Sequence, residues 1–390
     1  MMKTREQLRG NQIVRAASSA LVVRSAAIVA RGLRDLSRHS NWLIKRVPIG
    51  HSPRLAVSSA GQVAAVTRLR MQGTNGLAIY DIESGVLSQT LTAPGATAVC
   101  PPETPATLAW SATGQELVAA WGGWPRELHV FDLSQKKLAG TFGRFSKFPG
   151  SLAWSDRGKY FAAASTGGSE AQLRIWGAAP ESTGPVVFSE KSVCEAGASA
   201  WSRWRQPDAL GEPATAVPPG AEPDESAFWG FGCTAFSPDE MRLAAAVEME
   251  GDWTDDAIVV LEMPSLRKLG LWHAEGHITN MSWSAAGREL IYCAAGQAFW
   301  LSPEAAEQQA LPFGAELCSC HPQLPICLCF SSWLKSSAKG RLFLVDLRRL
   351  EVVDEHAAEG IADLCWSLDG SKAYAMTSDG LAYIYEPPPL

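Results

Sequence analysis

Leu152-Ala153-Trp154-Ser155-Asp156-Arg157-Gly158 is the stretch of sequence on which the prediction of the fold rests. Its apolar and aromatic residues alternate, as in a strand with one buried face. The Ser-x-x-Gly that ends the stretch is typical of a turn that reverses the chain. The same pattern recurs over residues 108–114, 281–287 and 364–370. A pattern that recurs at a regular interval predicts a repeat architecture.

The Ser of this hairpin turn, or its equivalent, serves as one anchor residue in each repeat. Successive anchors lie about 45 residues apart, the length typical of a four-stranded propeller blade. One interval, from Ser155 to Ser237, is much longer and indicates an insertion. The seven anchors are Ser58, Ser111, Ser155, Ser237, Ser284, His321 and Ser367.

Each repeat also contains a later apolar strand, such as Leu128-His129-Val130-Phe131-Asp132, and two repeats follow Gly-His pairs, Gly50-His51 and Gly276-His277. Together with the aromatic-Ser-x-x-Gly hairpins, these features resemble the WD40-repeat family over residues 41–390. The resemblance implies an all-β, seven-bladed β-propeller. It also implies a hydrogen-bonded tetrad of His, Asp, Ser/Thr and Trp in each complete blade. No repeat here carries all four groups, and only Trp176 holds the Trp of the signature dipeptide.

The two ends of the repeat region are predicted to meet in one blade. The seventh repeat has only three strands before the sequence reaches Pro387, while an unassigned strand over residues 42–49 precedes the first repeat. We expect this strand to fill the outer place of the seventh blade, because that pairing closes the ring and leaves no free sheet edge. The chain before Asn41 then leaves from the face opposite the Gly50-His51 loop, close to the C-terminus.

Residues 1–40 are predicted to form a basic helical arm. Residues 1–54 carry eleven Lys/Arg and two acids, whereas the whole chain has a net charge of −6, so the propeller itself is acidic. From about residue 20 onward the helix is amphipathic. Its apolar side is formed by Leu21, Ile28, Val29, Leu33 and Leu36. Its basic side is formed by Arg24, Arg31, Arg34 and Arg38.

Several uses of this arm are compatible with its sequence. It can pack on its own propeller, lie in a groove of a partner, or bind an anionic membrane surface through residues 20–38. Its Arg- and Ser-rich composition also suits a mitochondrial transit peptide. The odd number of cysteines, nine, favours a reducing compartment. We therefore expect a cytoplasmic protein, with a mitochondrial or other organellar location as the alternative.

Candidate partner-binding residues lie in the insertion and in the loops between second and third strands. The insertion, residues 190–227, is rich in Pro and Gly and contains Trp and Arg, which are enriched at binding hot spots. The alternative is that its tryptophans cover the propeller's own core. The loop aromatics suggest a contact surface on the same face, unless each packs into its own blade. The candidates are Trp201, Trp204, Arg205, Trp121, Trp124, Trp253 and Trp333.

Two clusters resemble metal sites. Cys318, Cys320, Cys327 and Cys329 form two Cys-x-Cys pairs, but they occupy the core-facing positions of one hairpin, where free Cys packs as a small hydrophobe. The acidic stretch over residues 248–256 lacks the ligand spacing of a calcium loop, so we expect a solvated loop. Neither cluster predicts a metal, and we expect no cofactor.

The sequence favours a non-catalytic scaffold over an enzyme or a nucleic-acid-binding protein. Its seven His residues form no recognisable base–nucleophile arrangement, and it has no Gly-rich phosphate loop. An acidic propeller is unsuited to binding phosphate backbones. We expect the loop face and residues 190–227 to bind one protein partner and the arm to bind another. The alternative is a peripheral membrane or organelle-targeted protein anchored by the arm.

Overall fold

A computed structural model describes most of the chain beyond the arm. The described residues are 43–48, 55–69, 74–92, 106–121, 127–145, 147–166, 171–177, 186–189, 228–249, 255–332, 340–358, 360–377 and 379–387. The predicted arm, residues 1–40, and the predicted insertion, residues 190–227, lie outside these ranges. Within them, no helix is long and apolar enough to cross a membrane.

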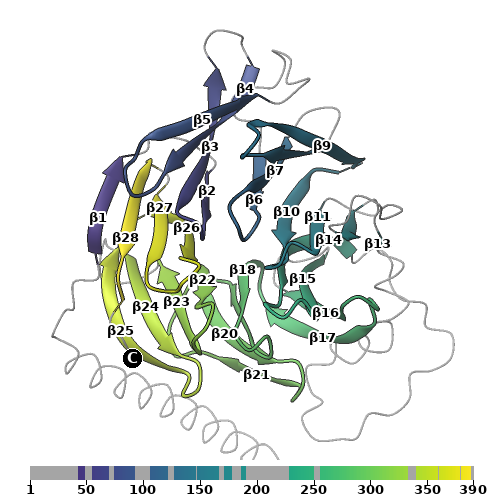
Figure 1. The fold of residues 1–390 in the computed structure, drawn as a ribbon. Coiled ribbons are helices and arrows are strands. Elements are labelled where there is room, and N and C mark those ends of the chain that lie inside the picture. Colours follow the sequence, from purple (N-terminus) through teal and green to yellow (C-terminus); the bar gives the residue numbers. More distant parts are fainter. Residues whose placement is uncertain are drawn as a thin grey trace, which may run out of the picture.

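The described strands form seven antiparallel sheets of four strands each, arranged as blades around a ring (Figure 1). Blade 1 consists of β2 (Leu55–Ser58), β3 (Gln62–Leu69), β4 (Thr74–Asp81) and β5 (Leu87–Thr92). Blade 2 consists of β6 (Ala106–Trp110), β7 (Glu116–Trp121), β8 (Glu127–Asp132) and β9 (Lys137–Arg144). Blade 3 consists of β10 (Pro149–Trp154), β11 (Tyr160–Ser165), β12 (Gln172–Gly177) and β13 (Val186–Ser189).

The remaining blades follow the same order, with the first strand nearest the centre of the ring. Blade 4 consists of β14 (Phe228–Phe236), β15 (Arg242–Met249), β16 (Asp255–Glu262) and β17 (Lys268–Glu275). Blade 5 consists of β18 (Ile278–Trp283), β19 (Leu290–Ala294), β20 (Gln297–Ser302) and β21 (Glu307–Ala310). Blade 6 consists of β22 (Leu317–Cys320), β23 (Ile326–Ser331), β24 (Gly340–Asp346) and β25 (Glu351–Ala358).

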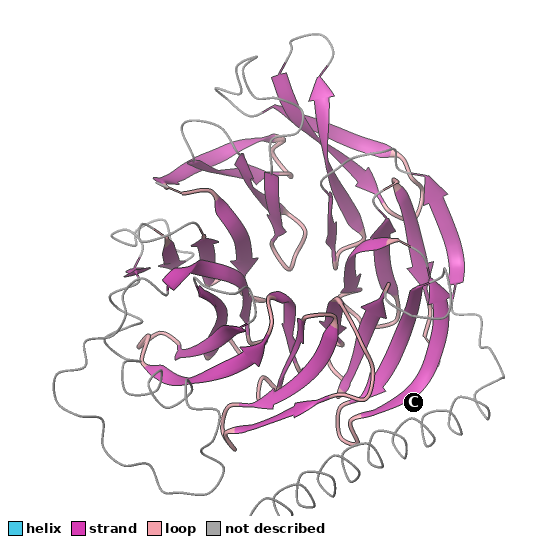
Figure 2. Ribbon diagram, turned by 180° about the vertical axis from the view of Figure 1, so that it is seen from behind, coloured by secondary structure: helices cyan, strands magenta, loops and turns pink. Residues whose placement is uncertain are grey.

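Blade 7 closes the ring with strands from both ends of the repeat region, as predicted. It combines β26 (Ile361–Trp366), β27 (Ala373–Thr377) and β28 (Leu381–Tyr385) with β1 (Leu43–Pro48) as its outer strand. Leu43 pairs with Tyr385 and Pro48 with Leu381, so β1 begins at the end of the blade where β28 finishes. Figure 2 shows the same closed ring from behind.

The hairpin turns have a common internal structure. All seven predicted anchors are buried, between 0% and 6% exposed. In blade 3, the Ser155 hydroxyl accepts a hydrogen bond from the Tyr160 N–H at 2.9 Å, which satisfies a backbone donor inside the turn. Gly158 has a φ of 72°, a left-handed conformation that glycine adopts without strain. In blade 3, Ser155 and Gly158 therefore each meet a physical requirement of the turn.

Several hairpin tryptophans connect neighbouring blades. The indole N–H of Trp110 donates to the Ala56 carbonyl of blade 1 at 3.0 Å. The indole of Trp283 donates in the same way to blade 4, and that of Trp366 to blade 6. In blade 3, the buried indole nitrogen of Trp154 has no hydrogen-bond partner among the described residues. These tryptophans were predicted to pack between sheets. In three blades the indole N–H also donates a hydrogen bond to a backbone carbonyl of the preceding blade.

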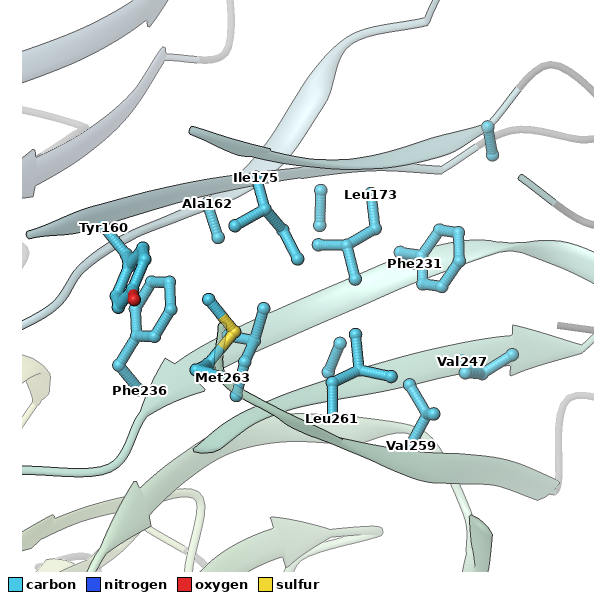
Figure 3. Close-up of a cluster of buried hydrophobic side chains, with 14 of the residues drawn as sticks. Tyr160, Ala162, Leu173, Ile175, Phe231, Phe236, Val247, Val259, Leu261 and Met263 are labelled. Atoms are coloured by element: carbon cyan, nitrogen blue, oxygen red, sulfur yellow. The ribbon is translucent and has the colours of Figure 1, made fainter. Parts of the chain in front are cut away.

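The hydrophobic core consists of separate layers between adjacent blades. Figure 3 shows the layer between blades 3 and 4, in which side chains from β11 and β12 face those from β14, β15 and β16. Leu173, Phe231 and Leu243 in this layer are completely buried. Each blade therefore contributes to two layers, one on each side of its sheet, which is how propeller blades are stabilised by their neighbours.

Candidate functional site

The two faces of the ring carry different connections between strands. The loop face carries the connections between second and third strands and those between blades, such as residues 275–277. The turn face carries the Ser-x-x-Gly hairpins and the turns between third and fourth strands. The predicted partner-binding residues of the loops and of residues 190–227 belong to connections that start and end on the loop face. That placement follows from the strand order.

The contacts of these predicted residues are not tested by the structure. Trp121 is the last residue of β7, and only its strand assignment is described. The other candidates lie outside the described residues: Arg24, Arg31, Arg34, Arg38, Trp124, Trp201, Trp204, Arg205, Trp253 and Trp333. Their participation in binding stays a prediction.

A cluster of titratable side chains lies on the loop face between blades 4 and 5. Asp256, at the start of β16, is 6% exposed. One of its carboxylate oxygens accepts the Ile278 N–H at 2.8 Å and lies 3.0 Å from Nδ1 of His277. The prediction of a solvated acidic loop over residues 248–256 is therefore wrong for Asp256, because its carboxylate ties the third strand of blade 4 to the first strand of blade 5.

The same cluster contains a carboxyl group with a shifted pKa. Burial raises the pKa of Glu248 to about 7, although nearby His277 opposes the shift. The hydrogen bond with Asp256 raises the pKa of His277. The His277 side chain is 59% exposed, so the charge of this cluster can be sensed at the surface. Because Glu248 gains or loses its negative charge near pH 7, the charge of the cluster depends on pH.

Further acidic groups continue along the loop face toward blade 6. Glu275 is exposed immediately before the Gly276-His277 pair. Glu316 accepts a hydrogen bond from Ser332 at 2.5 Å, and its backbone carbonyl accepts one from Thr279 at 2.9 Å. Together with Glu248, these side chains form what we call the acidic rim: Glu248, Asp256, Glu275, His277 and Glu316.

Sequence reasoning missed the acidic rim for a specific reason. It looked for the His–Asp pair of the WD40 tetrad within a single repeat. In the structure, His277 precedes blade 5, but its acid, Asp256, belongs to blade 4. The Gly276-His277 dipeptide could have indicated this pair. The acid to look for was one at the start of the third strand in the preceding blade.

The cysteine cluster lies in the core, as predicted. Cys327 and Cys329 are completely buried, Cys318 is 4% exposed, and Cys320 is partly buried against the same layer between blades 5 and 6. All seven cysteines in the described part of the chain are free thiols. Among the described residues, no three His, Cys, Asp or Glu side chains are arranged to hold a metal ion. In this layer the cysteine side chains pack as small apolar groups beside Ile291, Phe343 and Val345.

Comparisons with known proteins support the fold. The β-propeller domain of Myceliophteria thermophila Cps50 (Swd1) is similar to this chain with a TM-score of 0.57 and 13% identity, over 89% of this chain and 99% of that domain. A chain of the Mitotic Checkpoint Complex is similar with a TM-score of 0.60 and 11% identity, over 90% of this chain and 94% of that one. No protein-family model and no curated protein matches the sequence. The seven-bladed propeller is thereby confirmed, and the likeness to the WD40 family beyond the fold stays a resemblance.

Proposed function

We propose that the protein is a non-catalytic scaffold or complex subunit whose loop face binds a protein partner. The acidic rim is the observation that supports this proposal, because it lies on the face to which residues 190–227 and the Trp-bearing loops are attached. Carboxylates suit a basic segment of a partner through ion pairs, and the tryptophans predicted in the loops of the same face would add cation–π contacts. One of the similar solved structures is a β-propeller domain, and the other is a chain of a complex.

The expectation that the arm binds a second partner, and the alternative of membrane or organelle anchoring, remain predictions from the sequence. The free thiols of the described cysteines are compatible with the proposed reducing, cytoplasmic location.

A charge-reversal experiment tests the loop-face proposal. Cross-linking mass spectrometry on the affinity-purified protein would compare the wild type with Glu275→Lys/Glu316→Lys. Glu307→Lys, an exposed change on the outer strand β21, is the matched control. We expect partner cross-links near the acidic rim to fall at least tenfold in the double variant and to persist in the control. Equal loss in both variants, or cross-links spread over the outer strands, would contradict the proposal.

The raised pKa of Glu248 gives the same binding a pH dependence. As the pH falls through about 7, Glu248 takes up a proton and loses its negative charge. A basic partner is therefore expected to bind several-fold more weakly at pH 6 than at pH 8. In Glu248→Gln the difference between the two pH values should shrink. An unchanged pH profile in this variant would remove Glu248 from the binding site.

A further inference from the structure

Five cysteine side chains meet in the layer between blades 5 and 6. Cys293 comes from β19 of blade 5, and the other four come from the β22–β23 hairpin of blade 6. The Sγ atoms of Cys327 and Cys329 lie 3.9 Å apart. The hairpin and the facing blade 5 belong entirely to the described residues. Neighbouring thiols can be oxidised to a disulfide, a reaction that an ordinary apolar packing group does not undergo. The hairpin thiols are those of Cys318, Cys320, Cys327 and Cys329.

The pairing of the two hairpin strands places these thiols opposite one another. β22 and β23 are antiparallel, with Cys320 opposite Cys327 and Cys318 opposite Cys329. Side chains of directly opposite residues lie on the same side of a sheet, and here that side faces blade 5. The hairpin therefore carries two pairs of thiols, and each pair spans its two strands.

No backbone hydrogen bond joins Cys320 to Cys327. In the neighbouring pair, the His321 N–H donates to the Ile326 carbonyl at 2.9 Å, and hydrogen-bonded pairs alternate with non-hydrogen-bonded pairs in an antiparallel sheet. The Cys320 N–H instead donates to the Ser282 hydroxyl of blade 5 at 2.9 Å. Cα atoms of a non-hydrogen-bonded pair are about 4.5 Å apart, within the range of about 4.4–6.8 Å that a disulfide spans. A disulfide between these residues therefore fits the spacing of the strands.

Cys320 is the most exposed of the five cysteines. It is partly exposed on β22, the strand of blade 6 nearest the centre of the ring, and its Sγ donates to the Ser282 carbonyl at 3.6 Å. Cys293, Cys327 and Cys329 are completely buried. Burial, together with hydrogen bonding to neighbouring thiols that include Cys320, raises the pKa of Cys327. A soluble oxidant therefore meets Cys320 first, while Cys327 stays protonated behind it.

We propose that Cys320 and Cys327 form a redox modification site, at which a peroxide converts the blade 6 hairpin to an intramolecular disulfide. With hydrogen peroxide, the Cys320 thiolate takes up one oxygen as sulfenic acid. The O–O bond breaks, and the released hydroxide takes up the proton that the thiol had lost. The Cys327 sulfur then attacks the sulfenic sulfur, and the hydroxyl leaves with the Cys327 proton as a second water. The two thiols lose two electrons, which the peroxide accepts.

The Cys318–Cys329 pair is less suited to the first oxidation step. Cys318 is 4% exposed, and its Sγ donates to Oδ1 of Asn280 at 3.1 Å and to the Ile291 carbonyl at 3.4 Å, both in blade 5. A buried thiol is inert toward soluble reagents compared with an exposed one. Oxidation is therefore expected at Cys320.

Oxidation of this site changes the contact between blades 5 and 6. The disulfide joins the first two strands of blade 6 and removes the S–H donor that bonds to the Ser282 carbonyl of blade 5. Thiols can reduce it again by exchange. In a reducing compartment such bonds are usually transient and serve to sense the redox state. This site is independent of partner binding at the loop face.

Differential alkylation of the full-length protein tests the proposal. The reduced protein is treated with excess hydrogen peroxide, remaining thiols are blocked with iodoacetamide after denaturation, and thiols released by reduction are labelled with N-ethylmaleimide. Tandem mass spectrometry assigns the second label. We expect this label on Cys320 and Cys327 together, in monomeric protein, and its loss when dithiothreitol is added after the peroxide.

Three variants separate the two steps. Cys320→Ser should reduce the label on Cys327 at least tenfold, because no sulfenic acid forms beside it. Cys327→Ala should leave the sulfenic acid unresolved, so dimedone labelling of Cys320 should rise several-fold above the wild type. Cys365→Ser is the matched control, since Cys365 is also partly exposed on an innermost strand, β26, but has Tyr374 opposite it. It should leave the disulfide unchanged.

Several outcomes would overturn the proposal. One is a disulfide from Cys320 to Cys100 or Cys194, the cysteines outside the described residues, or to a second copy of the chain. Another is a disulfide between Cys318 and Cys329 alone. Absence of any disulfide after excess peroxide, or an equal yield in Cys320→Ser, would overturn it as well.

Discussion

The interfaces between blades 3 and 4 and between blades 1 and 2 are built on the same strand order but differ in how they treat polar groups. Between blades 3 and 4, the partly buried hydroxyls of Ser151 and Thr234 lie 3.0 Å apart and are hydrogen-bonded. Ser151 accepts the Thr234 N–H at 3.0 Å, and Tyr160 stacks on Phe236 at a ring distance of 6.1 Å. The apolar layer around them is continuous (Figure 3).

Glu240 is the most distinctive element of the interface between blades 3 and 4. It occupies the position of the turn glycine, with a φ of 60°, and is 7% exposed. Its carboxylate reaches back into the blade 3 turn, where it accepts hydrogen bonds from the Ser155 hydroxyl and, at 2.9 Å, from the Arg157 N–H. The unfavourable backbone conformation is thus offset by bonds that join two blades.

Between blades 1 and 2, three buried polar atoms lack a hydrogen-bond partner in the described residues. They are Oε1 of Gln62, Oε1 of Gln89 and Nδ1 of His129. Gln62 lies against Gly114 of blade 2, and strand alternation places Gln89 and His129 on the facing sides of β5 and β8. Burying an unpaired polar group costs about 1–3 kcal/mol. The interfaces between blades therefore differ in stability, and we expect the ring to open first between blades 1 and 2.

The largest loss of stability is expected from a cavity in the interface between blades 3 and 4. Phe231→Ala removes a completely buried ring from the layer between blades 3 and 4. A loss of about 3–5 kcal/mol in unfolding free energy is expected, measured by urea denaturation. Hydrogen exchange should increase in β11 and β15 before it increases elsewhere. A loss below about 1 kcal/mol would show that this layer is no more stable than the one between blades 1 and 2.

An intermediate effect is expected from Glu240. Glu240→Ala leaves the blade 3 donors unpaired and keeps the left-handed backbone, so a loss of about 2–3 kcal/mol is expected. Glu240→Gly is the matched control, because glycine adopts this φ without strain but supplies no acceptor. If the carboxylate joins the blades, the glycine variant should recover only a minor part of the loss in thermal denaturation. Full recovery would assign the whole effect to backbone strain.

The smallest effect is a gain in stability, which is expected from a substitution in the interface between blades 1 and 2. Burial lowers the pKa of His129. The unfolded chain therefore binds a proton more readily than the folded one, and stability falls as the pH drops below about 6.5. His129→Leu should raise the unfolding free energy by about 1 kcal/mol at pH 7.5 and by more at pH 5.5. A smaller gain at pH 5.5 than at pH 7.5 would contradict this account.

The sequence was sufficient to predict the blades because a propeller hairpin repeats its physical requirements. Six of the seven turns combine a buried Ser hydroxyl with a residue of left-handed φ, and the turn of blade 6 uses His321 and has no such residue. The anchors could therefore be located from the sequence alone. The pairing of β1 with β28 followed from counting strands in the last blade.

The sequence was not sufficient to predict interactions between blades. The Asp256–His277 pair joins residues of different repeats, and so do the hydrogen bonds that the Glu240 carboxylate accepts from the blade 3 turn. The spacing of residues within one repeat does not predict either interaction. In Glu240 the departure from the turn pattern was visible, since Glu stands where Gly is expected. Its role was not visible, because it depends on how closely two blades approach. The partner-binding candidates outside the described residues remain predictions.

The closure of blade 7 has a consequence for the synthesis of the protein. β1 is among the first strands to be made, but its pairing partner, β28, is among the last. The first strand therefore has no neighbour for its backbone groups until nearly the whole repeat region has been translated. Closing so long a loop is a late and slow step of folding. A binding partner that recognises only the closed ring would thereby discriminate finished chains from interrupted ones.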